Sequence, residues 1–283
     1  MEQLVKICSI YGGVLYYLEL LGDGSRPVEK FLDRNNVFYT DVQFILNQEL
    51  RSPDKYFSIL KLIANGKNSI SEISGSMGVN SNELSPYLDK LNSMKVIKKE
   101  FPFDSKRRNS RYRIASNFFN FYFKFVFEGA GLIETGKEET LTRYVYDNLD
   151  IYISRTFEDI CNEFILEFSG KLLSIPVIEI GRWWGKNPLK DKGKEIEEID
   201  IVGKLESGGM IFGEVKWKGS TVGVNTLADL KLKSNLFTAT EKVFVLMSKS
   251  GFDVGVKKAV EKGTDRVYLI DLNIMGDIIC SEQ

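Results

Sequence analysis

Two acids and a lysine are spaced so that they could hold a divalent cation next to a phosphate group. Asp200 lies in the apolar stretch EIDIVGKL, and Glu214 and Lys216 lie in MIFGEVKW, which follows it. Both stretches have the composition of β-strands, whose successive side chains point to opposite faces. Glu214 and Lys216 therefore share one face. We expect Asp200 and Glu214 to supply carboxylate oxygens to the cation, and Lys216 to orient or deprotonate an attacking water.

The absence of histidine narrows the chemistry that these residues can perform. None of the 283 residues is histidine, which excludes histidine-ligated zinc sites and the hydrolases and nucleases that use a histidine base. Hydrolysis of a phosphodiester would then depend on carboxylates, a lysine and a hard cation, Mg²⁺ or Mn²⁺, which takes oxygen ligands. A second interpretation is an ion-pair cluster on the surface of a hairpin, without chemistry.

The elements that must position these residues fall in residues 156–283. TFEDICNEFILEFSG predicts a long amphipathic helix, and five apolar stretches predict strands: PVIEIGRWW, EIDIVGKL, MIFGEVKW, KVFVLMSK and RVYLIDL. Helical patterns in TLADLKLKSNLF and GVKKAVEKG separate the last three strands. This order predicts an α/β domain with a mixed central sheet flanked by helices. Residues 129–155 predict a helical connector that leads into it.

Residues 51–128 predict a module of a different kind. Three helical segments, YFSILKLIA, SISEISGSM and NSNELSPYLDKLNSM, precede two strand-like segments, VIKKEFPF and SRYRIA, which is the order of a winged helix-turn-helix. This module holds 14 Lys and Arg against 7 Asp and Glu, whereas residues 1–50 hold 4 against 7 and residues 129–283 hold 20 against 25. The middle module is therefore the candidate for a polyanionic partner.

The basic residues of this module gather in and beside the predicted hairpin, where they would contact DNA. They are Lys98, Lys99, Lys106, Arg107, Arg108 and Arg111. The third helix carries little positive charge, so non-specific contacts to the phosphate backbone are favoured over the reading of bases. The alternative is a winged helix that serves for packing or dimerisation, with a solvated basic loop.

Residues 1–50 predict short amphipathic helices, interrupted by a glycine pair and by the turn GDGSRP. The chain has no apolar run of the roughly 18 to 20 residues that a membrane span needs, and no signal-peptide pattern at its start. Its cysteines, Cys8, Cys161 and Cys280, are odd in number and scattered, which argues against a disulfide framework. We therefore expect a cytoplasmic protein without a membrane partner.

The spacing of the acids and the lysine resembles the site motif of the PD-(D/E)XK nuclease superfamily, because Asp200 is followed by 13 residues and then by Glu-Val-Lys. The resemblance implies a restriction-endonuclease-like fold, with Asp200 and Glu214 as metal ligands and Lys216 as a catalytic residue. In many members an acid on the preceding helix joins the site. Glu158, in SRTFEDIC, matches that position best, and Glu163 is the alternative.

A wider resemblance extends over nearly the whole chain. GRWWG, EEIDIVG and GEVKW resemble the C-terminal domain of a family of archaeal AAA-type ATPases, a domain long labelled as of unknown function and related to PD-(D/E)XK nucleases. DKYFSILKLIANG, LSPYLDKLNSMKVIKKEFPF and RYRIASNFFNFYFKFV resemble the winged-helix module that precedes it in that family. YGGVLYYLELL resembles the family's ATPase lid, with Leu15 in place of a proline. The chain thus resembles the C-terminal part of such a protein, lacking the nucleotide-binding core.

The stretch GLIETGKE decides whether an ATP site is expected. It follows the GxxxxGK phosphate-loop pattern up to Glu138, which replaces the hydroxyl that ligates magnesium and adds a negative charge beside the phosphates. No second acidic strand fits the partner motif of a phosphate loop. We therefore expect no ATP site, and we do not expect the chain to be an ATPase by itself.

The sequence supports three hypotheses of function. The first is a DNA-associated protein with Mg²⁺-dependent phosphodiesterase activity. Its parts are a helical ATPase-lid-like segment (1–50), a winged-helix domain (51–128), a helical connector (129–155) and a PD-(D/E)XK nuclease-like domain (156–283). The second is a non-catalytic scaffold that binds DNA or a protein partner. The third is a fragment of a split or truncated ATPase that acts with a separate ATPase subunit. Association with a second copy of the chain stays open.

Overall fold

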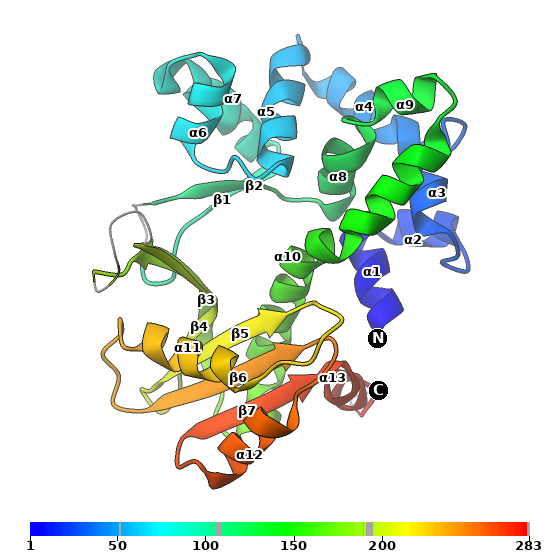
Figure 1. Cartoon of the computed structure of the whole chain (residues 1–283). Helices are drawn as coiled ribbons and strands as arrows, with labels where there is room; N and C mark the ends of the chain where they lie inside the picture. The colour runs from blue at the N-terminus through cyan, green and yellow to red at the C-terminus, as the bar shows by residue number, and fades with distance from the viewer. Residues whose placement is uncertain (51, 106–108, 189, 191–194, 282–283) are drawn as a thin grey trace. The chain divides into compact units, whose positions relative to one another are not determined.

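A five-stranded mixed sheet carries the residues of the candidate site (Figure 1). In this computed structural model its order is β3-β4-β5-β6-β7. The strands are β3 (Val177–Lys186), β4 (Ile196–Leu205), β5 (Met210–Lys216), β6 (Lys242–Ser248) and β7 (Arg266–Asp271). The pairs β3–β4 and β4–β5 are antiparallel, whereas β5–β6 and β6–β7 are parallel, so the predicted mixed sheet is confirmed. The structure describes residues 1–50, 52–105, 109–188, 190 and 195–281.

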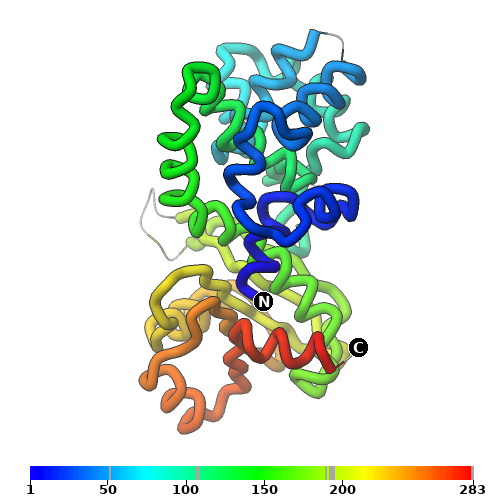
Figure 2. Tube along the Cα trace, turned by 90° about the vertical axis from the view of Figure 1, so that its right-hand side faces the viewer, coloured from blue at the N-terminus to red at the C-terminus, as the bar shows by residue number. Residues whose placement is uncertain are grey.

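Helices cover both faces of this sheet. α11 (Val224–Ser234) and α12 (Val254–Lys262) connect the parallel strands on one face, and the C-terminal half of α10 (Glu138–Leu173) lies on the other (Figures 1 and 2). α13 (Leu272–Cys280) follows β7 and lies beside α10, where Lys171 Nζ donates a hydrogen bond to Ser281 Oγ at 2.7 Å. The core between the sheet and the helices α11 and α12 includes Val202, Phe212, Leu246, Leu227, Leu230 and Val256.

The remaining elements are mostly short helices. They are α1 (Glu2–Tyr11), α2 (Leu15–Leu21), α3 (Pro27–Leu32), α4 (Val37–Glu49), α5 (Asp54–Ala64), α6 (Ile70–Met77), α7 (Ser81–Ser93), α8 (Asn117–Phe121), the π-helical turn η1 (Tyr122–Val126) and α9 (Ala130–Glu134), with β1 (Ile97–Glu100) and β2 (Arg111–Ile114) between α7 and α8. Among the described residues no single helix is long and apolar enough to cross a membrane; α1 and α2 meet that criterion only together, as a pair bent by 116°.

The segment predicted as three helices and two strands has that order. α5, α6 and α7 precede β1 and β2, which pair antiparallel. α6 begins at a capping box, in which Ser69 and Glu72 satisfy each other's backbone N–H groups. Leu84, Leu88 and Leu91 form the buried stripe of α7. That these elements form a winged helix stays a prediction.

An aromatic cluster packs these helices together. Phe31 lies 4.7 Å from Phe118 and 4.9 Å from Phe121, measured between ring centres, and Tyr11 lies 4.7 Å from Phe38. All five rings are buried. The aromatic run that begins at residue 117 therefore fills a core, which is where most of the stabilising contribution of such rings arises.

The chain divides into two compact units. The sheet unit contains Met1–Val5, Phe101–Arg108 and Ile153–Gln283, and the helical unit contains Lys6–Glu100 and Asn109–Tyr152. α10 passes from one unit to the other as one continuous helix, where a connector followed by a separate helix was expected. All residues of the candidate active site lie in the sheet unit. The predicted domain ranges stay predictions.

Candidate active site

Asp200 is fixed on β4 by the backbone of the neighbouring strand. Its Oδ2 accepts a hydrogen bond from Val215 N at 2.9 Å, and its carbonyl oxygen accepts one from Asn162 Nδ2 of α10 at 3.0 Å. The regular pairing of β4 with β5 ends at Ile201↔Gly213. Asp200 thus stands just beyond that pairing, where its carboxylate takes the place of a backbone partner.

Glu214 and Lys216 project from the same face of β5, as strand alternation requires. Lys216 Nζ lies 2.5 Å from Glu214 Oε1. Lys233 of α11 approaches the same carboxylate from the helix, with its Nζ 3.5 Å from Glu214 Oε2. Glu214 is only 9% exposed, whereas the side chain of Lys216 is 35% exposed and that of Lys233 14%. Each oxygen of Glu214 thus faces one lysine.

The surroundings of Asp200 disfavour its ionised form and raise its pKa to about 7. Burial is the largest cause, and the negative charges of Glu214 and Glu158 add to it. The hydrogen bond from Val215 N and the charge of Lys216 lower the pKa, but by less. A positive charge placed beside Asp200 would therefore relieve an existing electrostatic penalty.

The two lysines of the site are cations at neutral pH. Burial is the largest single effect and would lower the pKa of Lys216 and of Lys233. The acids around them together outweigh it, namely Glu214 and Asp200 for both lysines and Asp229 for Lys233, so both pKa values lie above the ordinary lysine value. A protonated amine cannot accept a proton from water. Lys216 is therefore suited to stabilising negative charge, and less suited to the role of a base.

Glu158 reaches the site from α10, and two arginines hold it. Arg182 Nε lies 3.0 Å and Arg155 Nη1 3.1 Å from Glu158 Oε2. Arg182 Nη1 also lies 2.9 Å from Asp159 Oδ1. Burial raises the pKa of Glu158, although the charges of Arg182 and Arg155 act against it. The alternative acid on this helix, Glu163, is exposed.

The oxygen atoms of the site fit a hard divalent cation. Asp200 and Glu214 offer carboxylates from adjacent strands, and Mg²⁺ typically needs only one or two because it keeps several waters. Asn162 Oδ1 is a further buried oxygen, with no hydrogen-bond partner within the described residues. In the same part of the chain, no three His, Cys, Asp or Glu side chains form a group that could hold a metal ion. A cation here would be held by two carboxylates and by water.

Comparison with known proteins gives a family match over the stretch that contains the site. Residues 122–227 match the model of DUF234, described as "Archaea bacterial proteins of unknown function". This stretch is similar to DUF234. It includes Glu158, Asp200, Glu214 and Lys216 and ends before Lys233.

Two proteins are similar to a larger part of the chain. The uncharacterised protein MJECL04 of Methanocaldococcus jannaschii is 31% identical over 230 residues, which are 77% of this chain and 48% of that protein. The chain thus spans about half the length of the curated relative that it matches. Among solved structures, protein VC1899 from Vibrio cholerae is 12% identical with a TM-score of 0.35, and the match covers 88% of this chain and 57% of that one. The resemblance to an ATPase family stays a prediction.

The residues predicted to contact DNA lie on β1, on β2 and between them. Lys98 Nζ is 3.1 Å from Glu100 Oε1, and the Lys99 ammonium lies 5.6 Å from the ring centre of Tyr112. Arg111 stands opposite Glu100 in the hairpin. Glu100 partly neutralises the positive charge of Lys98, so this lysine attracts a phosphate group less strongly than an unpaired lysine would. The other candidates, Lys106, Arg107 and Arg108, lie outside the described residues.

Sequence reasoning did not assign Lys233, Arg155 or Arg182 to the site. Both arginines act on Glu158: Arg155 stands three residues before it on α10, a spacing that predicts a contact on a helix, whereas Arg182 comes from β3 and has no such signal. The sequence gives a weak indication that Lys233 faces the inside of the protein, because it lies three positions after Leu230 on a helix whose buried residues include Leu230 and Ser234. A lysine at the spacing of a buried helical stripe indicates a partner inside the protein.

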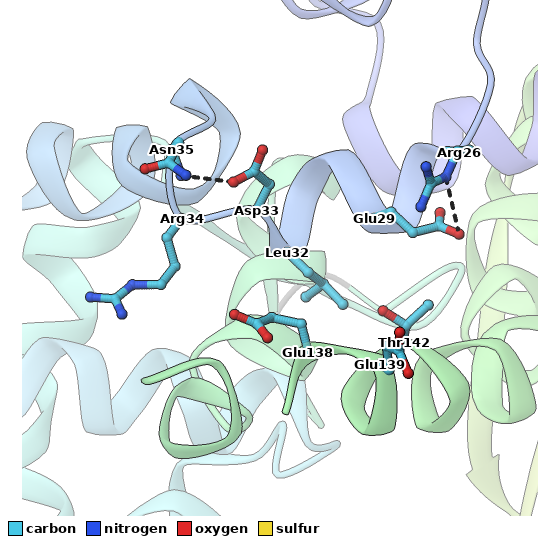
Figure 3. Close-up of a pocket in the computed structure, with 9 residues that line it drawn as sticks. All are labelled: Arg26, Glu29, Leu32, Asp33, Arg34, Asn35, Glu138, Glu139 and Thr142. Carbon is cyan, nitrogen blue, oxygen red and sulfur yellow. Dashed lines mark hydrogen bonds and ion pairs between the residues drawn. The ribbon is translucent and has the colours of Figure 1, made fainter. Parts of the chain in front are cut away.

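The helical unit has a pocket of about 320 Å³ next to the start of α10 (Figure 3). It is lined by Arg26, Glu29, Leu32, Asp33, Arg34, Asn35, Glu138, Glu139 and Thr142. Four of these residues are acids and two are arginines, so the lining is negative overall. Glu138, the residue that departs from the phosphate-loop pattern, is one of the acids. Such a lining disfavours a polyphosphate ligand.

Proposed function

We propose that the chain is a cytoplasmic, DNA-associated protein whose sheet unit hydrolyses phosphodiester bonds with the help of a divalent cation. The observation that carries the proposal is the approach of Asp200, Glu214 and Lys216 to one another from two adjacent strands, with Glu214 buried and Lys216 partly exposed. Lys216 Nζ lies 2.5 Å from Glu214, and the backbone that precedes Lys216 binds Asp200. This protein has no histidine, so two carboxylates that can bind a divalent cation, next to the ammonium group of Lys216, suit the hydrolysis of an anionic ester.

Each residue has a role in this proposal. Asp200 and Glu214 would hold Mg²⁺ or Mn²⁺, and such an ion, when bound, lowers the pKa of a water ligand and polarises the phosphate. Lys216 stabilises the negative charge that grows on the phosphate oxygens as water attacks. Glu158 assists through its charge, and Arg182 and Arg155 keep it in place. The sheet unit then corresponds to a restriction-endonuclease-like domain of the PD-(D/E)XK type.

The rest of the chain would supply binding. In this proposal α5, α6, α7, β1 and β2 form a winged helix that holds the DNA backbone, and residues 1–50 are the remnant of an ATPase lid. A separate ATPase subunit or a second copy of the chain would be a further partner.

A non-catalytic scaffold is the second candidate, and one observation favours it. Both oxygens of Glu214 face an ammonium group, with Lys216 at 2.5 Å and Lys233 at 3.5 Å. A carboxylate satisfied in this way can remain an inert ion-pair cluster, and the nuclease-like sheet would then serve to hold DNA or a partner.

Incubation of the whole chain with single-stranded, nicked and branched DNA, under Mg²⁺ or Mn²⁺, separates these candidates. We expect the wild type to cleave at least one of these substrates, and Asp200→Asn and Lys216→Ala to lose about 100-fold or more in rate. Lys218→Ala is the matched control, because Lys218 is an exposed lysine two residues beyond Lys216. Equal background cleavage by the wild type and Asp200→Asn would remove the enzymatic proposal and leave the scaffold.

A further inference from the structure

Lys233 is a partly buried lysine to which the proposed reaction does not yet assign a role. Its Nζ lies 3.5 Å from Glu214 Oε2 and 3.1 Å from Asp229 Oδ2, and its side chain is only 14% exposed. Its helix neighbours Leu230 and Ser234 are buried, so this side of α11 faces the sheet. Lys231, two residues earlier, instead pairs with Asp265 at 2.6 Å and is 36% exposed.

A second lysine beside Glu214 is more than the ion pair needs. Lys216 already neutralises this carboxylate at 2.5 Å, and Asp229 is 54% exposed and well solvated. Burial of the Lys233 ammonium group costs solvation, but Glu214, Asp229 and the charge of Asp200 together outweigh this cost and raise its pKa. The acids of the site thus keep a protonated lysine 3.5 Å from Glu214, where an anion that enters the site would meet it.

We infer that Lys233 is a substrate-binding residue of the proposed site, which rests on Glu214 and moves to a phosphate of the substrate when Glu214 binds a divalent cation. This inference rests on the proposed function and names its substrate contact. The lysine stem is flexible, and its ammonium binds a phosphate oxygen as a point charge with three donors. Each charge has a partner before and after this exchange. Glu214 exchanges the Lys233 ammonium group for the divalent cation, and Lys233 exchanges the Glu214 carboxylate for a phosphate group.

Two opposite effects on affinity follow when Lys233 loses its charge. Without DNA, Lys233→Met should bind Mn²⁺ more tightly than the wild type, by about tenfold, because one positive charge no longer competes for Glu214. With a cation present, the same variant should bind DNA more weakly, by about tenfold, because one phosphate contact is lost. A lysine that merely supports the fold would not strengthen one affinity while weakening the other.

The experiment uses the whole chain and compares Lys233→Met with the matched control Lys231→Met, on the same helix. Mn²⁺ is titrated into each protein without DNA, beside the wild type and Asp200→Ala. Binding of a short single-stranded oligonucleotide is then measured over a salt series, in Ca²⁺ and in EDTA. In Ca²⁺, Lys233→Met should weaken binding and reduce the slope of log affinity against log salt by about 0.7. In EDTA the variant and the wild type should bind alike, and Lys231→Met should follow the wild type throughout.

The outcomes keep the inference and the proposed function apart. Mn²⁺ binding by the wild type that Asp200→Ala abolishes and Lys233→Met leaves unchanged would overturn the inference while the proposed function stands. Weaker binding of both Mn²⁺ and DNA by Lys233→Met, with a lower melting temperature, would assign Lys233 a structural role and also overturn it. Equal Mn²⁺ binding by the wild type and Asp200→Ala would remove the proposed cation site itself, and the inference with it. Lys233→Arg, which keeps the charge, should retain both affinities within about threefold if the inference holds.

Discussion

Asp200 has the least favourable charge in the site. Its pKa is raised from 3.8 to about 7, first by burial and then by Glu214 and Glu158. An unfolded chain loses this proton near pH 3.8, whereas the folded chain keeps it until about pH 7. Between these values the folded state binds more protons than the unfolded state. The stability contributed by the protonated acid is therefore present at low pH and is lost as the pH rises to about 7.

Asp200→Asn should consequently stabilise the protein at high pH. The amide oxygen can still accept the hydrogen bond from Val215 N, but it carries no charge to bury. Each pKa unit corresponds to about 1.4 kcal/mol, so the gain over the wild type at pH 8 should reach at most about 4 kcal/mol and should shrink towards zero at pH 4. Urea denaturation in metal-free buffer at both pH values measures it, with Asp265→Asn, an exposed acid, as the control. A gain that is equal at the two pH values would contradict this account.

The same residue connects stability with function. Without a cation, the ionised carboxylates of Asp200, Glu214 and Glu158 repel one another and lower the stability of the folded protein. A bound cation removes this repulsion, so its binding should stabilise the folded protein. The positive charges of Arg182 and Arg155 already balance that of Glu158. The Asp200 carboxylate accepts a hydrogen bond from Val215 N, and the charge of Lys216 acts on it, but within the described residues it forms no ion pair. The charge left for a cation to balance is therefore that of Asp200.

At the scale of the element, β5 brings the acids together because it packs tightly between β4 and β6. A Cβ atom on Gly213 would lie 2.6 Å from Val245 Cγ1 and 2.8 Å from Ile201 Cβ. These contacts are closer than real Cβ atoms show, so one of the neighbouring strands would have to shift. Gly213 stands immediately before Glu214, and a shift of the strand there would move the carboxylate with it.

Gly213→Ala should therefore destabilise the protein by about 1 to 3 kcal/mol, as overpacking of a core does. The matched control is Gly219→Ala, at a position where an added Cβ would meet nothing within 4 Å. Urea denaturation gives the free energy of unfolding of both variants. If the two differ from the wild type equally, close packing of β5 does not hold Glu214 in place.

The sequence predicted these elements to the extent that local patterns specify them. The five strands and the order of α5, α6, α7, β1 and β2 follow from apolar runs and helical spacing. The continuity of α10 was not predicted. Glu138–Leu173 has no proline and a single glycine, Gly170, near its end, so no residue within it breaks the helix. Strand alternation aligned Glu214 with Lys216. The contacts of Lys233 with Glu214 and of Arg182 with Glu158 join separate elements, and such contacts follow only from tertiary packing.

At the scale of the whole molecule, positive charge and acidic chemistry lie in different parts of the chain. Residues 51–128 hold 14 Lys and Arg against 7 Asp and Glu, whereas residues 129–283 hold 20 against 25. A long polyanion would be attracted mainly by the first segment, and the acids of the second would repel it except where a cation or a lysine is present. The proposed function therefore predicts that the grip on DNA and the hydrolysis of a phosphodiester can be separated by substitution.

Replacement of Lys106, Arg107 and Arg108 by serine tests this separation. We expect the affinity for DNA at physiological salt to fall at least tenfold, and the slope of log affinity against log salt to fall by about 2 to 3, because three phosphate contacts are lost. Hydrolysis of a small diester such as bis(p-nitrophenyl) phosphate should be unchanged, since it needs only the site in the sheet unit. Lys257, Lys258 and Lys262 on α12 are exposed, so their replacement by serine removes the same charge elsewhere and is the control. Equal loss of DNA affinity in both triple variants would mean that net charge alone attracts DNA, and loss of small-diester hydrolysis in the first would mean that the basic segment takes part in the chemistry.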